Sequence, residues 1–115
     1  KAKHIFNYKE MKKWDDKITP SGKQMRSIWH IPLTSKKEKI HGKHPTQKPI
    51  ELLKRIIASS SNKGDLVLDP FNGSGTTGIV AKMLGRKYVG MDLDKKFLEL
   101  SVKRFNGVDV QRKLI

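Results

Sequence analysis

One stretch indicates the fold of this chain: Leu66-Val67-Leu68-Asp69-Pro70-Phe71-Asn72-Gly73-Ser74-Gly75-Thr76-Thr77-Gly78. Its first four residues form an apolar run between turn signals, which is typical of a short strand buried on both faces. Its glycines match the pattern G-x-G-x-x-G. Apolar residues then recur at helical spacing, and Gly85 stands where a glycine commonly follows the end of a helix.

The next segments continue the alternation of strand and helix. Residues 88–91 predict a second buried strand that ends at Asp92. A last helix is expected from about Lys95 to Phe105, with its inward face formed by Phe97, Leu98, Val102 and Phe105. Strand, glycine loop, helix and strand in this order predict a βαβ unit with parallel strands.

The segments before the glycine-rich stretch are less regular. Pro49 occupies the first position of an expected helix, whose apolar face consists of Leu53, Ile56 and Ile57. Residues 27–31 alternate loosely before Pro32 and predict a short strand, whereas residues 34–43 predict an exposed loop. Only two convincing buried strands result, and a two-stranded parallel sheet leaves both edges unpaired. The fold class is therefore α/β, with the chain expected to be part of a larger domain.

Composition points to a polyanionic partner. The 115 residues contain 25 Lys and Arg against 11 Asp and Glu, a formal net charge of +14. Most of that excess lies before Asp65, so a basic part precedes a nearly neutral one. The absence of Cys excludes a disulfide scaffold, and no apolar run is long enough to span a membrane. We expect a nucleic-acid-associated, cytoplasmic protein, the alternative being a lysine-rich surface that serves solubility.

The glycine loop and the acid that follows it predict a nucleoside-type cofactor. Asp92 lies 19 residues after Gly73, at the tip of the second strand, where its carboxylate can accept both hydroxyls of a ribose. The structural alternative is that Asp92 only caps the next helix. Gly78 is followed by Ile79 rather than Lys, which disfavours a P-loop. Asp69 at the strand end would repel a pyrophosphate and attract an amino or sulfonium group, which favours S-adenosylmethionine over NAD.

Two motifs resemble those of a known family. Residues 68–78 look like the cofactor motif of the amino-DNA methyltransferases, which methylate adenine N6 or cytosine N4. His44-Pro45-Thr46-Gln47-Lys48-Pro49 is similar to a second motif of that family, beside the methionine end of the cofactor. Their order matches the β group, and residues 26–32 resemble a segment just upstream. The resemblance implies a Rossmann-like methyltransferase fold with a parallel-rich sheet, present only as its C-terminal portion.

By position, the resemblance assigns the cofactor-binding residues. It places Asp92 at the ribose. On the methionine and sugar side of the cofactor it predicts Asp69, Phe71, Gly73, Ser74, Gly75 and Thr76. Near the cofactor carboxylate it predicts His44, Thr46 and Lys48. The Lys48 ammonium suits a carboxylate partner. For His44, a turn-stabilising role and a ligand contact stay equally open. Leu93 and Asp94 are candidates for contact with the adenine.

The family's catalytic motif, an Asp, Ser or Asn followed by Pro-Pro and an aromatic residue, does not occur in this sequence. We therefore assign no catalytic residue, and we expect these 115 residues alone to be inactive. Residues 1–43 would be the end of the target-recognition region and its return to the core, and residues 44–115 the C-terminal part of the catalytic domain. The missing N-terminal part would be a partner, and an oligomer is compatible with the sequence.

The resemblance further implies double-stranded DNA with a flipped target base as substrate, adenine N6 rather than cytosine N4, and a restriction-modification context. Lys36, Lys37 and Lys39 are candidates for phosphate contact. For Arg26, DNA contact and a structural carboxylate partner are equally open, while Trp14 and Trp29 are expected to pack rather than to stack on bases. Without Cys or an acidic cluster near His41 and His44, we expect no metal site.

Two other functions remain at this point. A nicotinamide-dependent oxidoreductase domain could use the same glycine motif. A non-catalytic module could bind nucleic acid through the basic part alone.

Overall fold

The computed structural model describes residues 3–15, 17–19, 22–39, 42, 44 and 46–108. Within them the chain forms two short 3₁₀ helices, three α-helices and two strands, in the order η1 (Glu10–Lys12), η2 (Lys36–Lys39), α1 (Ile50–Ser60), β1 (Leu66–Asp69), α2 (Thr76–Met83), β2 (Lys87–Gly90) and α3 (Lys95–Asn106). His41 and Pro45 lie outside the described residues.

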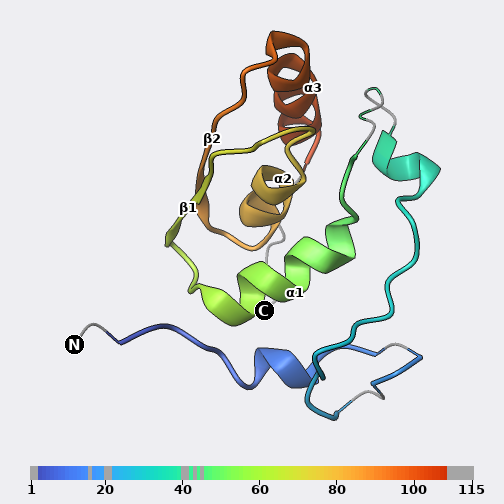
Figure 1. The fold of residues 1–115 in the computed structure, drawn as a ribbon. Coiled ribbons are helices and arrows are strands. Elements are labelled where there is room, and N and C mark those ends of the chain that lie inside the picture. The colour runs from blue at the N-terminus through green and yellow to red at the C-terminus, as the bar shows by residue number, and fades with distance from the viewer. Residues whose placement is uncertain are drawn as a thin grey trace.

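The two strands form a parallel sheet in which Leu66 pairs with Lys87 and Asp69 with Gly90. The helix α2 connects them, so the predicted βαβ unit is confirmed. Figure 1 shows α1 and α2 on the same side of the strands. The core lies between these helices and the sheet, where Ile57, Val80 and Ala81 are buried and Val67 and Tyr88 pack against them.

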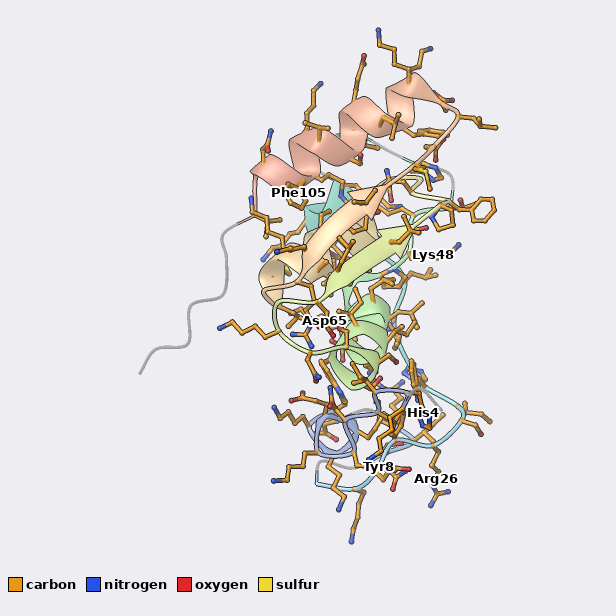
Figure 2. The ribbon with its side chains drawn as sticks, turned by 90° about the vertical axis from the view of Figure 1, so that its left-hand side faces the viewer. His4, Tyr8, Arg26, Lys48, Asp65 and Phe105 are labelled. Carbon is orange, nitrogen blue, oxygen red and sulfur yellow. The ribbon has the colours of Figure 1, made fainter. Side chains whose placement is uncertain are left out.

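The opposite face of the sheet is open, which corrects the prediction of strands buried on both faces. Leu66 and Leu68 are 64% and 58% exposed; Val89 on the neighbouring strand and Met91 just after it are 45% and 49% exposed. In Figure 2 this face is turned toward the viewer, with the helices α1 and α2 behind it. Apolar runs of this kind are typical of sheets covered on both sides, so the sequence pattern fits a sheet with a second covering layer.

The ends of the helices follow local capping rules. After α2, the Gly85 N–H donates to the Lys82 carbonyl and the Arg86 N–H to the Ala81 carbonyl, at 3.1 and 2.7 Å. This pattern with Gly85 at φ +77° is a Schellman motif, as its position predicts. Pro49 is the N-cap of α1 rather than its first helical residue. The predicted inward face of α3 is wrong at Val102, which is 57% exposed; Leu100 and Arg104 are the buried residues of that helix.

The N-terminal segment packs on α1 without forming the strand predicted at residues 27–31. Its Trp14 and Trp29 rings both lie 5.7 Å from the guanidinium carbon of buried Arg55, which bears out their packing role. The Asn7 side chain donates to the carbonyls of Ala58 and Ser61, at 3.0 and 2.8 Å. These bonds satisfy carbonyl groups that the end of α1 leaves free. Ile56, expected on the buried face of α1, is 41% exposed.

Among the described residues, no helix is long and apolar enough to cross a lipid bilayer.

Candidate functional site

A cavity of about 420 Å³ opens at the carboxyl end of the sheet. The glycine loop, the end of β2, the start of α3 and the segment before α1 line it together. Nine of the ten predicted cofactor-binding residues line this cavity: His44, Thr46, Lys48, Asp69, Phe71, Gly73, Ser74, Thr76 and Asp92. Gly75, the tenth, is buried behind the loop as the N-cap of α2. Ligands of open parallel sheets commonly bind at this end of the strands.

Asp92 closes the glycine loop onto the end of β2. Its Oδ2 accepts the backbone N–H of Gly73 at 2.8 Å, and its Oδ1 accepts that of Asp94 at 2.8 Å. These two bonds lower the pKa of Asp92 below its ordinary value, and the bond from the Asp94 N–H has the larger effect. The carboxylate is therefore charged at neutral pH. Asp94 itself caps α3, accepting the Lys96 N–H at 2.8 Å. The alternative in which Asp92 serves as that cap is therefore wrong.

Asp69 and Asn72 shape the other end of the loop. The Asp69 carboxylate accepts the Phe71 N–H at 3.0 Å, while the Phe71 ring is 87% exposed at the rim of the cavity. Asn72 is buried, and its Oδ1 accepts the Tyr88 hydroxyl at 2.6 Å. Burial, and second the charge of Asp69, raise the pKa of Tyr88, so the phenol stays a donor to Asn72. The loop is thus fixed to β2 through a side chain that the sequence motif does not reveal.

The segment around His44 forms the opposite wall. The His44 Nδ1 accepts the Thr46 N–H at 3.1 Å, so a neutral ring carries its proton on Nε2. The ring packs on Phe97 with centroids 4.0 Å apart and lies beside Gly73. His44 therefore stabilises the local turn and also borders the cavity. The Lys48 ammonium donates to the Thr46 carbonyl at 3.1 Å, and Figure 2 shows Lys48 beside the end of β1.

Two candidates for contact with an adenine ring differ in position. The Leu93 side chain is fully exposed and lines the cavity. Asp94 is not among the lining residues, and its carboxylate is used as the cap of α3. Leu53 and Phe97 are further lining residues, and both were expected to face inward only as packing residues of their helices.

The basic 3₁₀ helix η2 is attached to the same wall. Glu38 within it accepts the Ile50 N–H at 2.8 Å, and the Gln47 side chain donates to the Glu38 carbonyl at 2.7 Å. The predicted phosphate contacts Lys36, Lys37 and Lys39 therefore lie on a turn that is bonded to the segment beside the cavity. Arg26 is exposed, and Figure 2 shows it at the opposite end of the molecule from α3.

No group of three or more His, Cys, Asp or Glu side chains suited to a metal ion occurs among the residues that the structure describes. The acidic groups of the cavity, Asp69 and Asp92, both accept hydrogen bonds from backbone N–H groups instead.

Comparison with known proteins identifies the family. A family model described as DNA methylase, of the N6/N4 type, matches residues 2–103. The chain belongs to the N6/N4 DNA methylase family. The predicted resemblance is thereby confirmed. Type II methyltransferase M2.LlaDCHI of Lactococcus lactis subsp. cremoris is 52% identical over 106 residues. Type II methyltransferase M2.DpnII of Streptococcus pneumoniae is 54% identical over 107 residues.

Solved structures confirm the fold class of this DNA methylase family member as part of a Rossmann-like methyltransferase fold. The crystal structure of the M1.HpyAVI–SAM complex has a TM-score of 0.69 at 36% identity, covering 92% of this chain and 46% of that one. The cytosine-N4-specific PvuII DNA methyltransferase has a TM-score of 0.53 at 34% identity, over 57% of this chain. The matches to the two curated relatives include 92% and 93% of this chain. They span only 38% of the length of each relative.

Proposed function

We propose that this chain supplies the cofactor-binding part of a DNA methyltransferase that transfers a methyl group from S-adenosylmethionine to an exocyclic base amine. The single observation that carries the proposal is the cavity in which the glycine loop, Asp92 and the His44–Lys48 segment meet. The family membership supplies the reaction class. The similar structure of M1.HpyAVI is that of a complex with SAM, which supports the choice of cofactor.

The cavity has suitable groups for each part of that cofactor. Asp92 retains free lone pairs on its carboxylate for the ribose hydroxyls, because each oxygen accepts one backbone bond. Asp69 provides negative charge for the α-amino group or the sulfonium, and Lys48 provides positive charge for the carboxylate. Phe71 and Leu93 offer exposed apolar surface at the rim for the adenine and the methyl-bearing side. When bound, the cofactor would supply the electrophilic methyl group.

The chain's own residues bind and orient the cofactor rather than activate the base. The sequence contains no Pro-Pro dipeptide and hence no counterpart of the family's catalytic motif. The open sheet face offers apolar surface at Leu66, Leu68, Val89 and Met91 for a further layer. We propose that the remainder of the complete protein brings the catalytic loop, and that the 115 residues alone do not transfer methyl groups.

DNA contact is proposed for the basic turn η2. Lys36 and Lys37 are exposed, and Glu38 holds the turn against the segment that borders the cavity. In the complete protein, replacing both by Ala should reduce the slope of log affinity against log salt by about 1 for each lost phosphate contact. Lys87→Ala is the control, since Lys87 is exposed at the start of β2, at the far end of the sheet. An unchanged slope in the double variant would contradict the assignment.

Adenine N6 is the proposed target. The proposal rests on the resemblance of the sequence motifs to the family. In support, the PvuII enzyme, which is cytosine-N4-specific, is 34% identical to this chain, less similar than M2.LlaDCHI and M2.DpnII at 52% and 54%. Because those relatives are named type II methyltransferases, the proposed setting is a restriction-modification system in the cytoplasm.

A methyl-transfer assay with the complete protein tests this function. Unmethylated duplex DNA and methyl-labelled S-adenosylmethionine are incubated with the protein, and the DNA is digested to nucleosides for mass spectrometry. The expected product is N6-methyladenine. N4-methylcytosine would overturn the choice of base while preserving the reaction class, and the absence of any methylated base would overturn the proposed function. Asp92→Ala, which removes the ribose acceptor, should abolish the product.

A further inference from the structure

Arg104 on α3 is a buried cation behind the glycine loop. Its side chain is only 4% exposed, and its Nη1 donates to the Ser74 carbonyl at 2.8 Å and to the Thr76 hydroxyl at 3.0 Å. Among the described residues, no carboxylate lies within ion-pair distance of its guanidinium. The positive charge is thus held by the oxygen atoms of the loop itself, and Arg104 does not line the cavity.

Thr76 extends this contact to the second wall of the cavity. Its hydroxyl accepts from Arg104 and donates to the Lys48 carbonyl at 3.1 Å. One chain of hydrogen bonds therefore runs from α3 through the glycine loop to the segment that carries His44 and Lys48. Both loops lack regular backbone pairing at these points, so their relative position depends on such side-chain bonds.

Ser101, one turn before Arg104, supports the loop by contact. A Cβ built on Gly75 would overlap the Ser101 Cβ and would lie 3.1 Å from the Ser101 Cα. The Ser101 hydroxyl donates to the Leu98 carbonyl at 2.8 Å, so it is already used within α3. Ser101 therefore provides bulk and Arg104 provides the directed bonds.

Burying the Arg104 guanidinium costs free energy, so the need to fill space between α3 and the loop does not by itself explain why an arginine occupies this position. Desolvation lowers the pKa of the guanidinium below its ordinary value, and the charge of Glu38 partly opposes this. An apolar side chain would fill the same space without that cost. A buried Arg that directs its hydrogen bonds to Ser74 and Thr76 of one loop is therefore suited to fixing the geometry of that loop.

We infer that Arg104 is a positioning residue for the cofactor site: through Ser74 and Thr76 it fixes the glycine loop and aligns it with the Lys48 segment. The inference rests on the proposed function, because the affinity for the cofactor is the property that this alignment serves. Removing the guanidinium should leave the helices and the sheet in place and allow the two walls of the cavity to move relative to each other.

Calorimetric titration of the complete protein with S-adenosylhomocysteine tests the inference. Arg104→Met keeps much of the side-chain length and removes both bonds, so the dissociation constant should rise about tenfold or more. Arg104→Lys retains a cation that can donate to both oxygens and should recover part of the affinity. Lys103→Met is the matched control, since Lys103 is exposed on the same turn of α3, and it should bind within about twofold of the unaltered protein.

The outcomes separate the inference from the proposed function. If the unaltered protein fails to bind S-adenosylhomocysteine, the proposed function fails and this inference with it. A second outcome is that the unaltered protein binds, circular dichroism shows that Arg104→Met is folded, and the two dissociation constants agree within about twofold. Only the inference is then overturned. If Arg104→Met does not fold, Arg104→Lys is combined with Thr76→Val. Losses in affinity that are less than additive in the double variant support the hydrogen-bond chain, and fully additive losses overturn it.

Discussion

The Glu38 carboxylate accepts the backbone N–H of Ile50 at 2.8 Å and so closes the free end of α1 from outside the helix. Pro49, the N-cap, makes no side-chain bond there. The second Glu38 oxygen accepts the Ser35 N–H at 3.0 Å. One acidic side chain therefore caps α1 and orients the basic turn η2 against the wall of the cavity.

Glu38→Ala should lower the free energy of unfolding by about 1–2 kcal/mol, because it removes a helix cap and exposes two donors. Urea denaturation measures this change. Glu99→Ala is the control, since Glu99 is an exposed glutamate within another helix, α3. Equal stability of the two variants would show that the Glu38 cap contributes nothing.

Tyr88→Phe should destabilise the protein by about 1–3 kcal/mol, because the buried Asn72 Oδ1 loses the hydroxyl donor that bonds it. The effect should reach the cofactor site, since Asn72 belongs to the glycine loop. Thermal unfolding and titration with S-adenosylhomocysteine measure the two effects. Tyr8→Phe, at a side chain 64% exposed, should change neither property. A Tyr88→Phe variant as stable as the Tyr8→Phe variant would refute the role of this bond.

Gly75→Ala should be more harmful than Gly64→Ala. Both glycines have positive φ, +80° and +90°, so both substitutions carry a backbone penalty of about 1–2 kcal/mol. Only at Gly75 would the new Cβ also overlap Ser101, which adds an overpacking cost of about 1–3 kcal/mol. Comparison of the two unfolding free energies isolates the contact with α3. Equal losses would mean that Ser101 does not constrain the loop.

The pH dependence of Asp92 has a definite sign. Its pKa in the folded protein is below the ordinary 3.8, so its stabilising effect is complete above pH 3.8 and is lost as the pH falls through the lower, folded value. The difference in unfolding free energy between the unaltered protein and Asp92→Asn should be constant from pH 8 to 9 and should shrink in acid. A difference that grows as the pH falls below 3.8 would contradict the hydrogen-bonding pattern.

Local sequence signals were sufficient for much of the fold. The Gly85 cap, the βαβ order and the glycine loop each depend on a few neighbouring residues, and the structure has all three. The strand predicted at residues 27–31 is absent because alternation alone does not provide a neighbouring strand for pairing. The apolar patterns of β1 and β2 predict two covered faces, whereas the described chain covers one.

The residues that line the cavity could be predicted from two sequence motifs, but the residues that hold its loops in place could not. Asp69, Asp92 and Lys48 stand in recognisable motifs, whereas Arg104 lies 30 residues from Ser74 and Glu38 lies 12 residues from Ile50. On α3, Arg104 resembles any basic residue of a last helical turn, and its burial depends on the tertiary position of the loop. Such long-range polar contacts leave no periodic signal in the sequence.

The most direct test of the central claim, that the cavity beside Asp92 is an S-adenosylmethionine site, is a pair of calorimetric titrations of the complete protein with S-adenosylhomocysteine and with NAD⁺. We predict saturable binding of S-adenosylhomocysteine that is lost in Asp92→Ala, and no binding of NAD⁺. Binding of NAD⁺ with no binding of S-adenosylhomocysteine would contradict the account.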